Sequence, residues 1–143
     1  MRECVLRHRR PAPRARIGAI AGRTRAASAC MDLSDGLADA VARVAEQSGT
    51  GAAIEAAALP VHPGAVRWFT SQGQDPITAA VAGGDDYELL FAVPARVRGR
   101  FRGVIRHAQG IPLTRIGELT REPEVVLLRD GRREPLPSGF VHF

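Results

Sequence analysis

Cysteine, lysine and long apolar runs are scarce or missing in this chain of 143 residues. The two cysteines, Cys4 and Cys30, are too few for a disulfide scaffold or a thiolate metal site. No apolar run reaches the roughly 18 residues that a membrane helix needs, and the N-terminus lacks the apolar core of a signal peptide. We therefore expect a soluble, cytoplasmic protein with no membrane partner.

Aromatic residues are also rare, at 5% of the chain, so the core must be built mainly from Ala, Val, Leu and Ile. The hydrophobic content of 45% and the charged content of 24% are typical of a globular protein and argue against wholesale disorder. A chain of this length is expected to fold as one domain with a sizeable core.

All 20 basic residues are arginine, and the formal net charge is +5. Arginine clusters at 2–25 and 96–106 are compatible with nucleic-acid binding. However, few aromatic residues are available to stack on bases, and the exclusive use of arginine is typical of a G+C-rich genome. We therefore favour a solvated, phosphate-friendly surface and expect no nucleic-acid partner.

Hydrophobic periodicity predicts strands and helices that do not alternate strictly, which is typical of an α+β fold with a layered mixed sheet flanked by helices. Residues 1–26 are expected to form an Arg- and Pro-rich connecting arm that ends in a short helix at 17–24, and residues 27–143 form the domain proper. Strands are expected at 27–31, 51–55, 86–93, 113–119 and 124–129, with a turn at 130–131 and an irregular tail from 135. Helices are expected from the cap signal at 34–36 to Gly49, and at 65–71, 76–82 and 97–108. Asp75 is expected to be the N-cap of the helix at 76–82.

Two carboxylates, a hydroxyl and a glycine stand together in the segment Asp32-Leu33-Ser34-Asp35-Gly36. The segment lies between a predicted strand and a predicted helix, where free backbone amides favour anions. The carboxylates can coexist with a bound phosphate if a cation such as Mg²⁺ neutralises both. Capping of the helix by Ser34 or Asp35, with Asp32 as a solvated turn residue, explains the same residues. The segment alone leaves both interpretations open.

A second acidic cluster, Gly83-Gly84-Asp85-Asp86, follows downstream. Paired glycines let the backbone approach a ligand closely or adopt a positive φ, and the acids can hydrogen-bond a polar substrate. Alone, the cluster is more typical of a tight helix-to-strand turn, and it is neither a Walker loop nor a dinucleotide fingerprint. Two such clusters in one small domain favour metal-assisted phosphate chemistry.

The sequence offers little support for nucleophilic catalysis, because no Gly-x-Ser-x-Gly elbow is present and the histidines lie in predicted loops, a helix end and the tail. Phe140 is a candidate of another kind. An aromatic residue that follows a glycine in an irregular tail can fold over a pocket and stack on a flat ring.

Taken in order, several motifs resemble those of thiamine-monophosphate kinase. The resemblance covers nearly all of this chain, but only the C-terminal half of that family's protein, and the arm at 7–14 resembles the family's interdomain connection. The motifs are Met31-Asp32-Leu33-Ser34-Asp35-Gly36-Leu37, Gly51-Ala52-Ala53-Ile54, Leu59-Pro60, the run 82–91, Thr114-Arg115-Ile116-Gly117 and Gly139-Phe140-Val141-His142-Phe143.

This resemblance implies a fold and a reaction. The superfamily also contains aminoimidazole ribonucleotide (AIR) synthetase, selenophosphate synthetase and HypE, so an AIR synthetase (PurM) C-terminal-domain-like fold is expected. The implied reaction is the Mg²⁺-dependent transfer of the γ-phosphoryl group of ATP onto thiamine monophosphate, which gives thiamine diphosphate. By position, the implied roles are Mg²⁺ binding by Asp32 and Asp35, an ATP contact by Ser34, and substrate contacts by Asp85 and Phe140.

Two departures from the family pattern matter. Asp85 stands where the family usually has Glu, which keeps the charge but shortens the reach. The family's N-terminal domain, which carries further metal- and ATP-binding acids and usually forms the homodimer, is not in this sequence. We therefore expect the chain alone to be poorly active or inactive. Another ATP-dependent enzyme of the superfamily and a non-catalytic binding or assembly domain are the alternatives.

Overall fold

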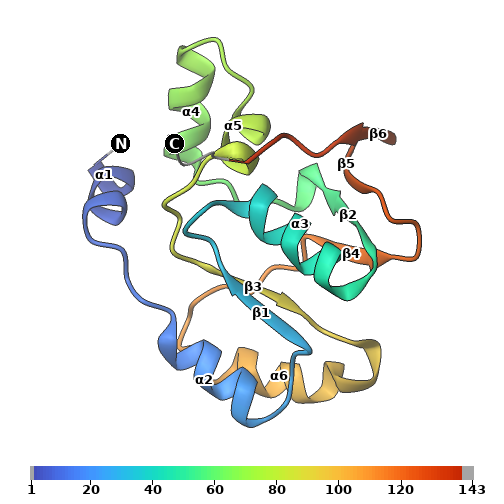
Figure 1. The fold of residues 1–143 in the computed structure, drawn as a ribbon. Coiled ribbons are helices and arrows are strands. Elements are labelled where there is room, and N and C mark those ends of the chain that lie inside the picture. Colours follow the sequence, from blue (N-terminus) through green and yellow to red (C-terminus); the bar gives the residue numbers. More distant parts are fainter. Residues whose placement is uncertain (1, 140–143) are drawn as a thin grey trace.

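The structure is a computed structural model that describes residues 2–139 (Figure 1). Short helices and short strands follow one another along it, with 3-10 turns at Ala56–Ala58 and Ala95–Val97. The helices are α1 (Arg2–Arg9), α2 (Ala15–Arg23), α3 (Leu37–Ser48), α4 (Pro63–Ser71), α5 (Pro76–Ala82) and α6 (Arg98–Arg106). The strands are β1 (Ala29–Asp32), β2 (Gly51–Glu55), β3 (Leu89–Ala92), β4 (Gly117–Thr120), β5 (Val125–Arg129) and β6 (Arg132–Pro135).

The described strands form two sheets. One is a ribbon in which β1 and β3 pair antiparallel, with Met31 opposite Leu90 and Asp32 opposite Leu89. The other has the order β4-β2-β5-β6, in which β2 and β5 run parallel and the remaining neighbours are antiparallel. These mixed pairings, flanked by helices, confirm the predicted α+β class.

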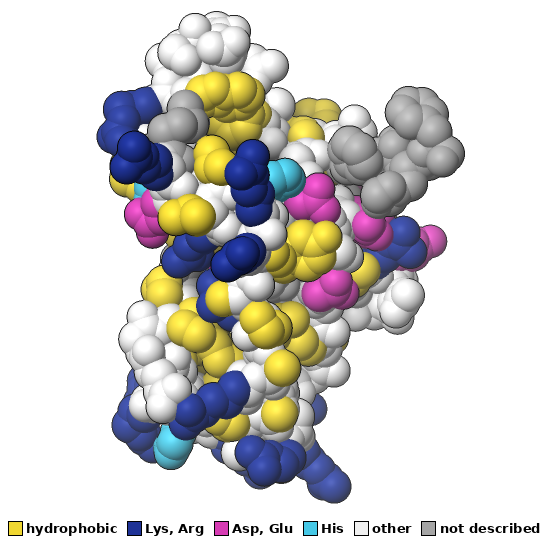
Figure 2. Space-filling model, turned by 90° about the vertical axis from the view of Figure 1, so that its left-hand side faces the viewer, with side chains coloured by type: hydrophobic (Ala, Val, Ile, Leu, Met, Phe, Trp, Pro, Cys, Tyr) yellow, Lys and Arg dark blue, Asp and Glu magenta, His cyan; other side chains and the backbone are white. Residues whose placement is uncertain are grey.

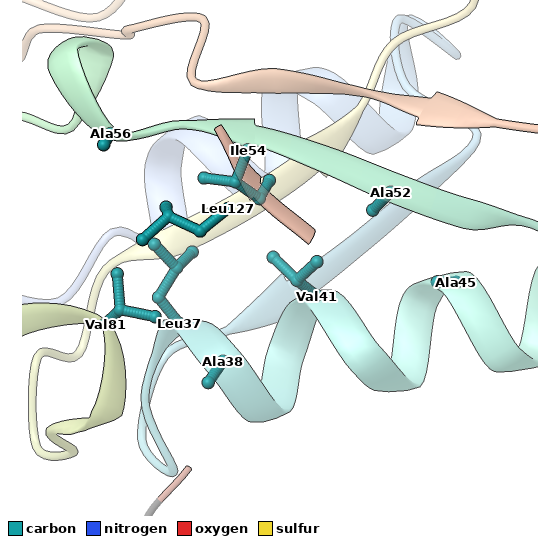
Figure 3. Close-up of a cluster of buried hydrophobic side chains, with 9 residues drawn as sticks. All are labelled: Leu37, Ala38, Val41, Ala45, Ala52, Ile54, Ala56, Val81 and Leu127. Carbon is teal, nitrogen blue, oxygen red and sulfur yellow. The ribbon is translucent and has the colours of Figure 1, made fainter. Parts of the chain in front are cut away.

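The main hydrophobic core lies between α3 and the four-stranded sheet (Figure 3). Leu37 and Val41 recur at helical spacing on one face of α3 and point towards Ile54 of β2 and Leu127 of β5. Val81 of α5 is fully buried at the Leu37 end of this cluster. The first turn of α3 is therefore anchored in the core, and with it the acidic segment that precedes the helix.

A second, smaller core is built by α2, α6 and the β1-β3 ribbon (Figure 1). Ile17 of α2 and Val104 of α6 are buried there, and the ring of Phe91 on β3 packs edge-on against Phe101 with centroids 5.7 Å apart. An isolated two-stranded ribbon is marginally stable in water, so the two helices supply the apolar cover that it needs.

The arm differs from its prediction, because residues 2–9 form helix α1 although the sequence shows no core face there. None of the described residues of α1 is buried, and the helix contacts α4. The Glu3 carboxylate lies 3.3 Å from Nε2 of His62, and Cys4 Sγ lies 3.3 Å from Nδ1 of the same ring. These polar contacts come from a distant segment, so no local pattern could predict them.

The strand predicted at 86–93 is shorter than expected and begins at Leu89. Asp85 and Tyr87 have φ values of 63° and 51°, a left-handed conformation that extended strand backbone does not contain. Tyr87 therefore lies outside the strand, and its side chain is 43% exposed. Residues 83–88 are a loop instead, and this loop belongs to the candidate site.

Other elements match their predicted positions closely. β2 and α5 have the predicted bounds, and Asp75 is the N-cap of α5. β4 is shorter than predicted, and β6 was not predicted. β6 follows the turn at Asp130 and Gly131 and is held by antiparallel pairing with β5.

Candidate active site

Two acidic loops lie side by side at one end of the β1-β3 ribbon. The first loop, residues 32–36, leads from β1 into α3, and the second loop, residues 83–88, leads from α5 into β3. Asp32 ends β1 and pairs with Leu89, which begins β3. The antiparallel pairing therefore brings the two predicted acidic clusters to the same edge, although about fifty residues separate them in sequence.

Backbone hydrogen bonds join the two loops. The Asp85 amide donates to the Ser34 carbonyl at 2.8 Å, and the Asp86 and Tyr87 amides donate to the Leu33 carbonyl at 3.2 and 3.3 Å. In return, the Leu33 amide donates to the Glu88 carbonyl at 3.0 Å. The structure thus brings Ser34 and Asp85, both predicted site residues, into direct backbone contact.

The two loops also approach each other closely where the first loop meets α3 and the second follows α5. A Cβ atom on Gly36 would lie 1.9 Å from the Gly83 carbonyl oxygen, so only glycine fits there. Gly36 also has a φ of 93°, which side-chain-bearing residues rarely adopt. Gly36 itself is the N-cap residue of α3, so neither Ser34 nor Asp35 occupies that position. The contact between the loops thus requires a glycine at position 36, whereas a Cβ atom on Gly83 would face the Ala79 carbonyl of α5 at 3.0 Å.

Negative charge accumulates in the second loop, which contains Asp85, Asp86 and Glu88. Partial loss of water around the Asp86 carboxyl, together with the charges of Glu88 and Asp85, raises its pKa from 3.8 to about 6, although the residue keeps exposed surface. The Tyr87 hydroxyl donates a hydrogen bond of 3.1 Å to Oδ1 of Asp85. A bound cation would relieve the repulsion between these carboxylates.

Cys30 lies two residues before Asp32 and on the same face of β1. Loss of surrounding water and the charge of Asp32 raise the pKa of its thiol. A thiol with a raised pKa remains protonated near neutral pH and is a weak nucleophile.

Glu88 is bound by an arginine of the arm. Nε of Arg14 donates to Oε2 of Glu88 at 2.7 Å, and Nη2 donates to Oε1 at 2.6 Å. The Arg14 side chain is only 12% exposed, and these hydrogen bonds raise its pKa. Arg7 adds a longer contact of 3.6 Å to Oε1. Sequence analysis missed this pair, because its members are 74 residues apart and the arginine-rich composition of the arm was the only signal.

The tail returns to the first turn of α3. A Cβ atom on Gly139 would lie 3.2 Å from the backbone nitrogen of Asp39 and 3.6 Å from Cβ of Ala38. Phe140, the predicted ring-stacking residue, lies outside the described residues. The part of the chain that can be described therefore ends beside the helix that follows the first acidic loop.

Asp32 and Asp35 offer carboxylate oxygens, which are the ligands that Mg²⁺ prefers. Asp32 is exposed and Asp35 is partly buried. Among residues 2–139, no group of three or more His, Cys, Asp or Glu side chains is arranged to hold a metal ion. The donor chemistry fits Mg²⁺, with two carboxylates from the first loop.

Figure 2 shows the face of the molecule that carries α1 and α2, where acidic side chains lie next to hydrophobic surface and arginines lie among them as well as at the upper and lower ends. No helix in the described part of the chain has the length and apolar character to cross a membrane.

Comparison with known proteins defines the class. The family model described as AIR synthase related protein, C-terminal domain, matches residues 8–130, and the chain belongs to this family. Escherichia coli HypE shares the fold, with a TM-score of 0.70 at 22% identity over 89% of this chain and 40% of that chain. The predicted AIR synthetase C-terminal-domain-like fold is therefore confirmed.

Within this family the chain is similar to thiamine-monophosphate kinases, which confirms the resemblance found in the motifs. The enzyme of Escherichia coli K12 is 38% identical over 141 residues, 97% of this chain and 42% of the relative. The structure from Stenotrophomonas maltophilia K279a has a TM-score of 0.74 at 32% identity, over 90% of this chain and 39% of that chain. The structure described as AaThiL complexed with AMPPCP and TMP has a TM-score of 0.72 at 32% identity, over 97% of this chain and 40% of that chain. The chain spans about two fifths of the length of these relatives.

Proposed function

We propose that this chain is the C-terminal half of a thiamine-phosphate kinase. The complete enzyme uses Mg²⁺ to transfer the γ-phosphoryl group of ATP onto thiamine monophosphate, giving thiamine diphosphate and ADP. Similarity to thiamine-monophosphate kinases, one of them solved with AMPPCP and TMP, supports this reaction. In this proposal residues 1–26 are the connecting arm and residues 27–143 form one wall of the active site.

The backbone pairing of the two acidic loops is the observation that carries the proposal. The hydrogen bond between Asp85 and Ser34 aligns a loop suited to metal and phosphate with a loop suited to a polar acceptor. Phosphoryl transfer depends on positioning and on charge neutralisation more than on a covalent nucleophile. Two aligned loops of carboxylates and hydroxyls supply part of the groups that this chemistry requires.

Each predicted residue has a role in the proposal. Asp32 and Asp35 bind Mg²⁺, which keeps part of its coordination for water and phosphate oxygens, and Ser34 contacts the ATP phosphates. Asp85 contacts thiamine monophosphate, and its left-handed backbone suits the shorter Asp better than Glu. Phe140 lies against the ring system of the substrate, and the approach of Gly139 to α3 supports this assignment.

Calorimetric titration of the chain with Mg²⁺ and the ATP analogue AMPPCP tests the proposal. We expect saturable binding that weakens at least about tenfold in Asp35→Asn, because the loss removes a direct metal ligand. Asp130→Asn is the matched control, because it removes the same charge from the exposed β5–β6 turn. Absence of saturable heat for the unmodified chain would instead favour a non-catalytic binding or assembly domain.

The proposal also includes a cytoplasmic location and a homodimer of the complete protein. Both expectations follow from the resemblance to the family. Sedimentation of the complete protein would test the dimer directly, and fractionation of cells with an antibody to this chain would test the location.

A further inference from the structure

The Arg14–Glu88 pair connects the arm to both acidic loops, yet neither residue has a role in the proposed reaction. We propose that Arg14 is a positioning residue that holds loops 32–36 and 83–88 in register through its bidentate salt bridge with Glu88. The geometry of this salt bridge does not depend on the proposed function, but its consequence for metal binding rests on that proposal.

Arg14 reaches Glu88 from a rigid base. Its backbone carbonyl accepts hydrogen bonds from the amides of Ile17 and Gly18 at 3.0 and 3.2 Å, and Ile17 is buried in the second core. α2 also lies directly against the start of β3, because a Cβ atom on Gly18 would be 3.4 Å from Cδ1 of Leu89. The guanidinium group of Arg14 is therefore held at a fixed position beside loop 83–88.

Glu88 passes this constraint to both loops. Its carboxylate takes both hydrogen bonds from Arg14, while its backbone carbonyl accepts the amide of Leu33 in the first loop. Residues 85–87, which precede it, also bond to Leu33 and Ser34. The Arg14–Glu88 salt bridge thus fixes the position at which the two loops join.

The Arg14–Glu88 salt bridge has the features of a strong interaction. Two parallel N–H···O bonds between a guanidinium and a carboxylate fix orientation as well as distance, and limited exposure reduces screening by solvent. The pair Arg115–Glu118 makes a useful contrast, because its members are three residues apart and their side chains are 70% and 66% exposed. Arg115 binds Glu118 at 2.9 Å without joining distant segments, which makes it the matched control.

Amide hydrogen exchange followed by NMR tests the positioning role. In Arg14→Gln we expect protection of the Leu33 and Asp85–Tyr87 amides to fall about tenfold or more, while amides of β2 and β5 keep their protection. Arg115→Gln should leave all these amides unchanged. Arg14→Lys keeps the charge but loses the bidentate fork, so its loss should be intermediate, and it serves as the test if Arg14→Gln does not fold.

Two results would overturn the positioning role. One is unchanged protection of the loop amides in both Arg14 variants. The other is an equal loss across the loops and the β2 and β5 amides, which would show a general loss of stability.

Titration with Mg²⁺ alone separates this inference from the proposed function. If Mg²⁺ binds the unmodified chain, its affinity should fall roughly threefold to tenfold in Arg14→Gln, as is usual for coupling through a packed network. Equal affinity in the two proteins, despite lost protection, would refute the role of Arg14 in the site. If Arg14→Gln loses protection of the loop amides in a chain that binds no Mg²⁺, this would support the positioning role of Arg14 and count against the proposed metal site.

Discussion

At the scale of single residues, the site depends on positions where no side chain can be accommodated. Gly36 meets the carbonyl of Gly83, so the two loops approach more closely than any residue with a Cβ would permit. The second loop also carries an electrostatic cost of its own, because loss of surrounding water and the neighbouring charges of Glu88 and Asp85 raise the pKa of Asp86. Close approach of like charges is typical of sites that bind a cation.

Gly36→Ala should lower the free energy of unfolding by more than about 2 kcal/mol, because the methyl group meets backbone atoms that cannot move aside and the left-handed φ adds strain. Urea unfolding followed by circular dichroism measures the change. Gly73→Ala is the control, since Gly73 has a φ of 70° but no described atom lies within 4 Å of a Cβ there. That variant should lose about 1 kcal/mol from backbone strain alone. Equal losses in the two variants would show that the contact with Gly83 is unimportant.

At the scale of elements, α5 is fixed at its beginning by a residue from another element. Asp75 accepts the Thr78 amide at 2.8 Å as N-cap, and Nη2 of Arg129 on β5 donates to the same carboxylate oxygen at 2.8 Å. Nε of Arg129 lies 3.7 Å from the Glu134 carboxylate and makes no hydrogen bond within the described residues. Because α5 leads directly into loop 83–88, this anchor helps to place the second loop.

The anchor of α5 predicts a pH dependence. Hydrogen bonds from Thr78 and Arg129 lower the pKa of Asp75 from 3.8 to about 2, so the folded state favours the charged carboxylate. Its contribution to stability is therefore complete above about pH 4 and disappears as the pH falls towards 2. Asp75→Asn keeps a capping group and loses the charge, so it should be less stable by up to about 1 kcal/mol at pH 7.

Denaturant unfolding at a series of pH values measures this effect. The difference between the unmodified chain and Asp75→Asn should narrow between pH 4 and 2, whereas Asp130→Asn should show no comparable narrowing. A difference that stays constant across this range would contradict the proposed charge interaction.

The elements also show which parts of the fold are predictable from sequence. β2 and α5 are predicted with their bounds because apolar runs, Asp75 and Pro76 act locally. α1 and β6 are not predicted, because contacts with His62 and pairing with β5 stabilise them from a distance. The alternation at 86–93 predicts too long a strand, since it cannot reveal that the amides of 85–87 bond to the first loop.

The candidate site follows the same division. Asp32, Ser34 and Asp85 stand out in the sequence because carboxylates, a hydroxyl and glycines are grouped locally. Arg14 and Glu88 do not, because their importance depends on the fold that brings them together. Sequence therefore indicates the chemistry of the site, while the structure reveals what holds it in place.

At the scale of the whole molecule, α3 connects the two halves of the fold. It packs on the four-stranded sheet through the main core and also contacts both strands of the ribbon (Figure 1). The acidic loops lie where these two parts meet. Movement of the ribbon relative to the sheet would therefore disturb the loops, so both cores contribute to the geometry of the site.

The complete reaction is expected to require protein beyond the described wall, because Asp32 and Asp35 supply only part of the oxygen ligands that Mg²⁺ and a triphosphate need. We predict that the chain alone releases ADP from ATP and thiamine monophosphate no faster than background. Fusion to the region of the Escherichia coli K12 relative that precedes its match to this chain should raise the rate in a coupled ADP assay. Within that fusion, Asp35→Asn should reduce kcat at least about a hundredfold, because charge neutralisation is the main catalytic contribution.

Asp130→Asn in the same fusion should retain the rate, and circular dichroism should establish that each fusion is folded. Turnover by the isolated chain at the rate of the full-length Escherichia coli enzyme would refute the need for a second wall. A folded fusion that binds Mg²⁺ and AMPPCP but transfers no phosphoryl group to thiamine monophosphate would refute the proposed acceptor. Binding with transfer to thiamine monophosphate, lost on removal of the Asp35 charge, would assign the first acidic loop to phosphoryl transfer.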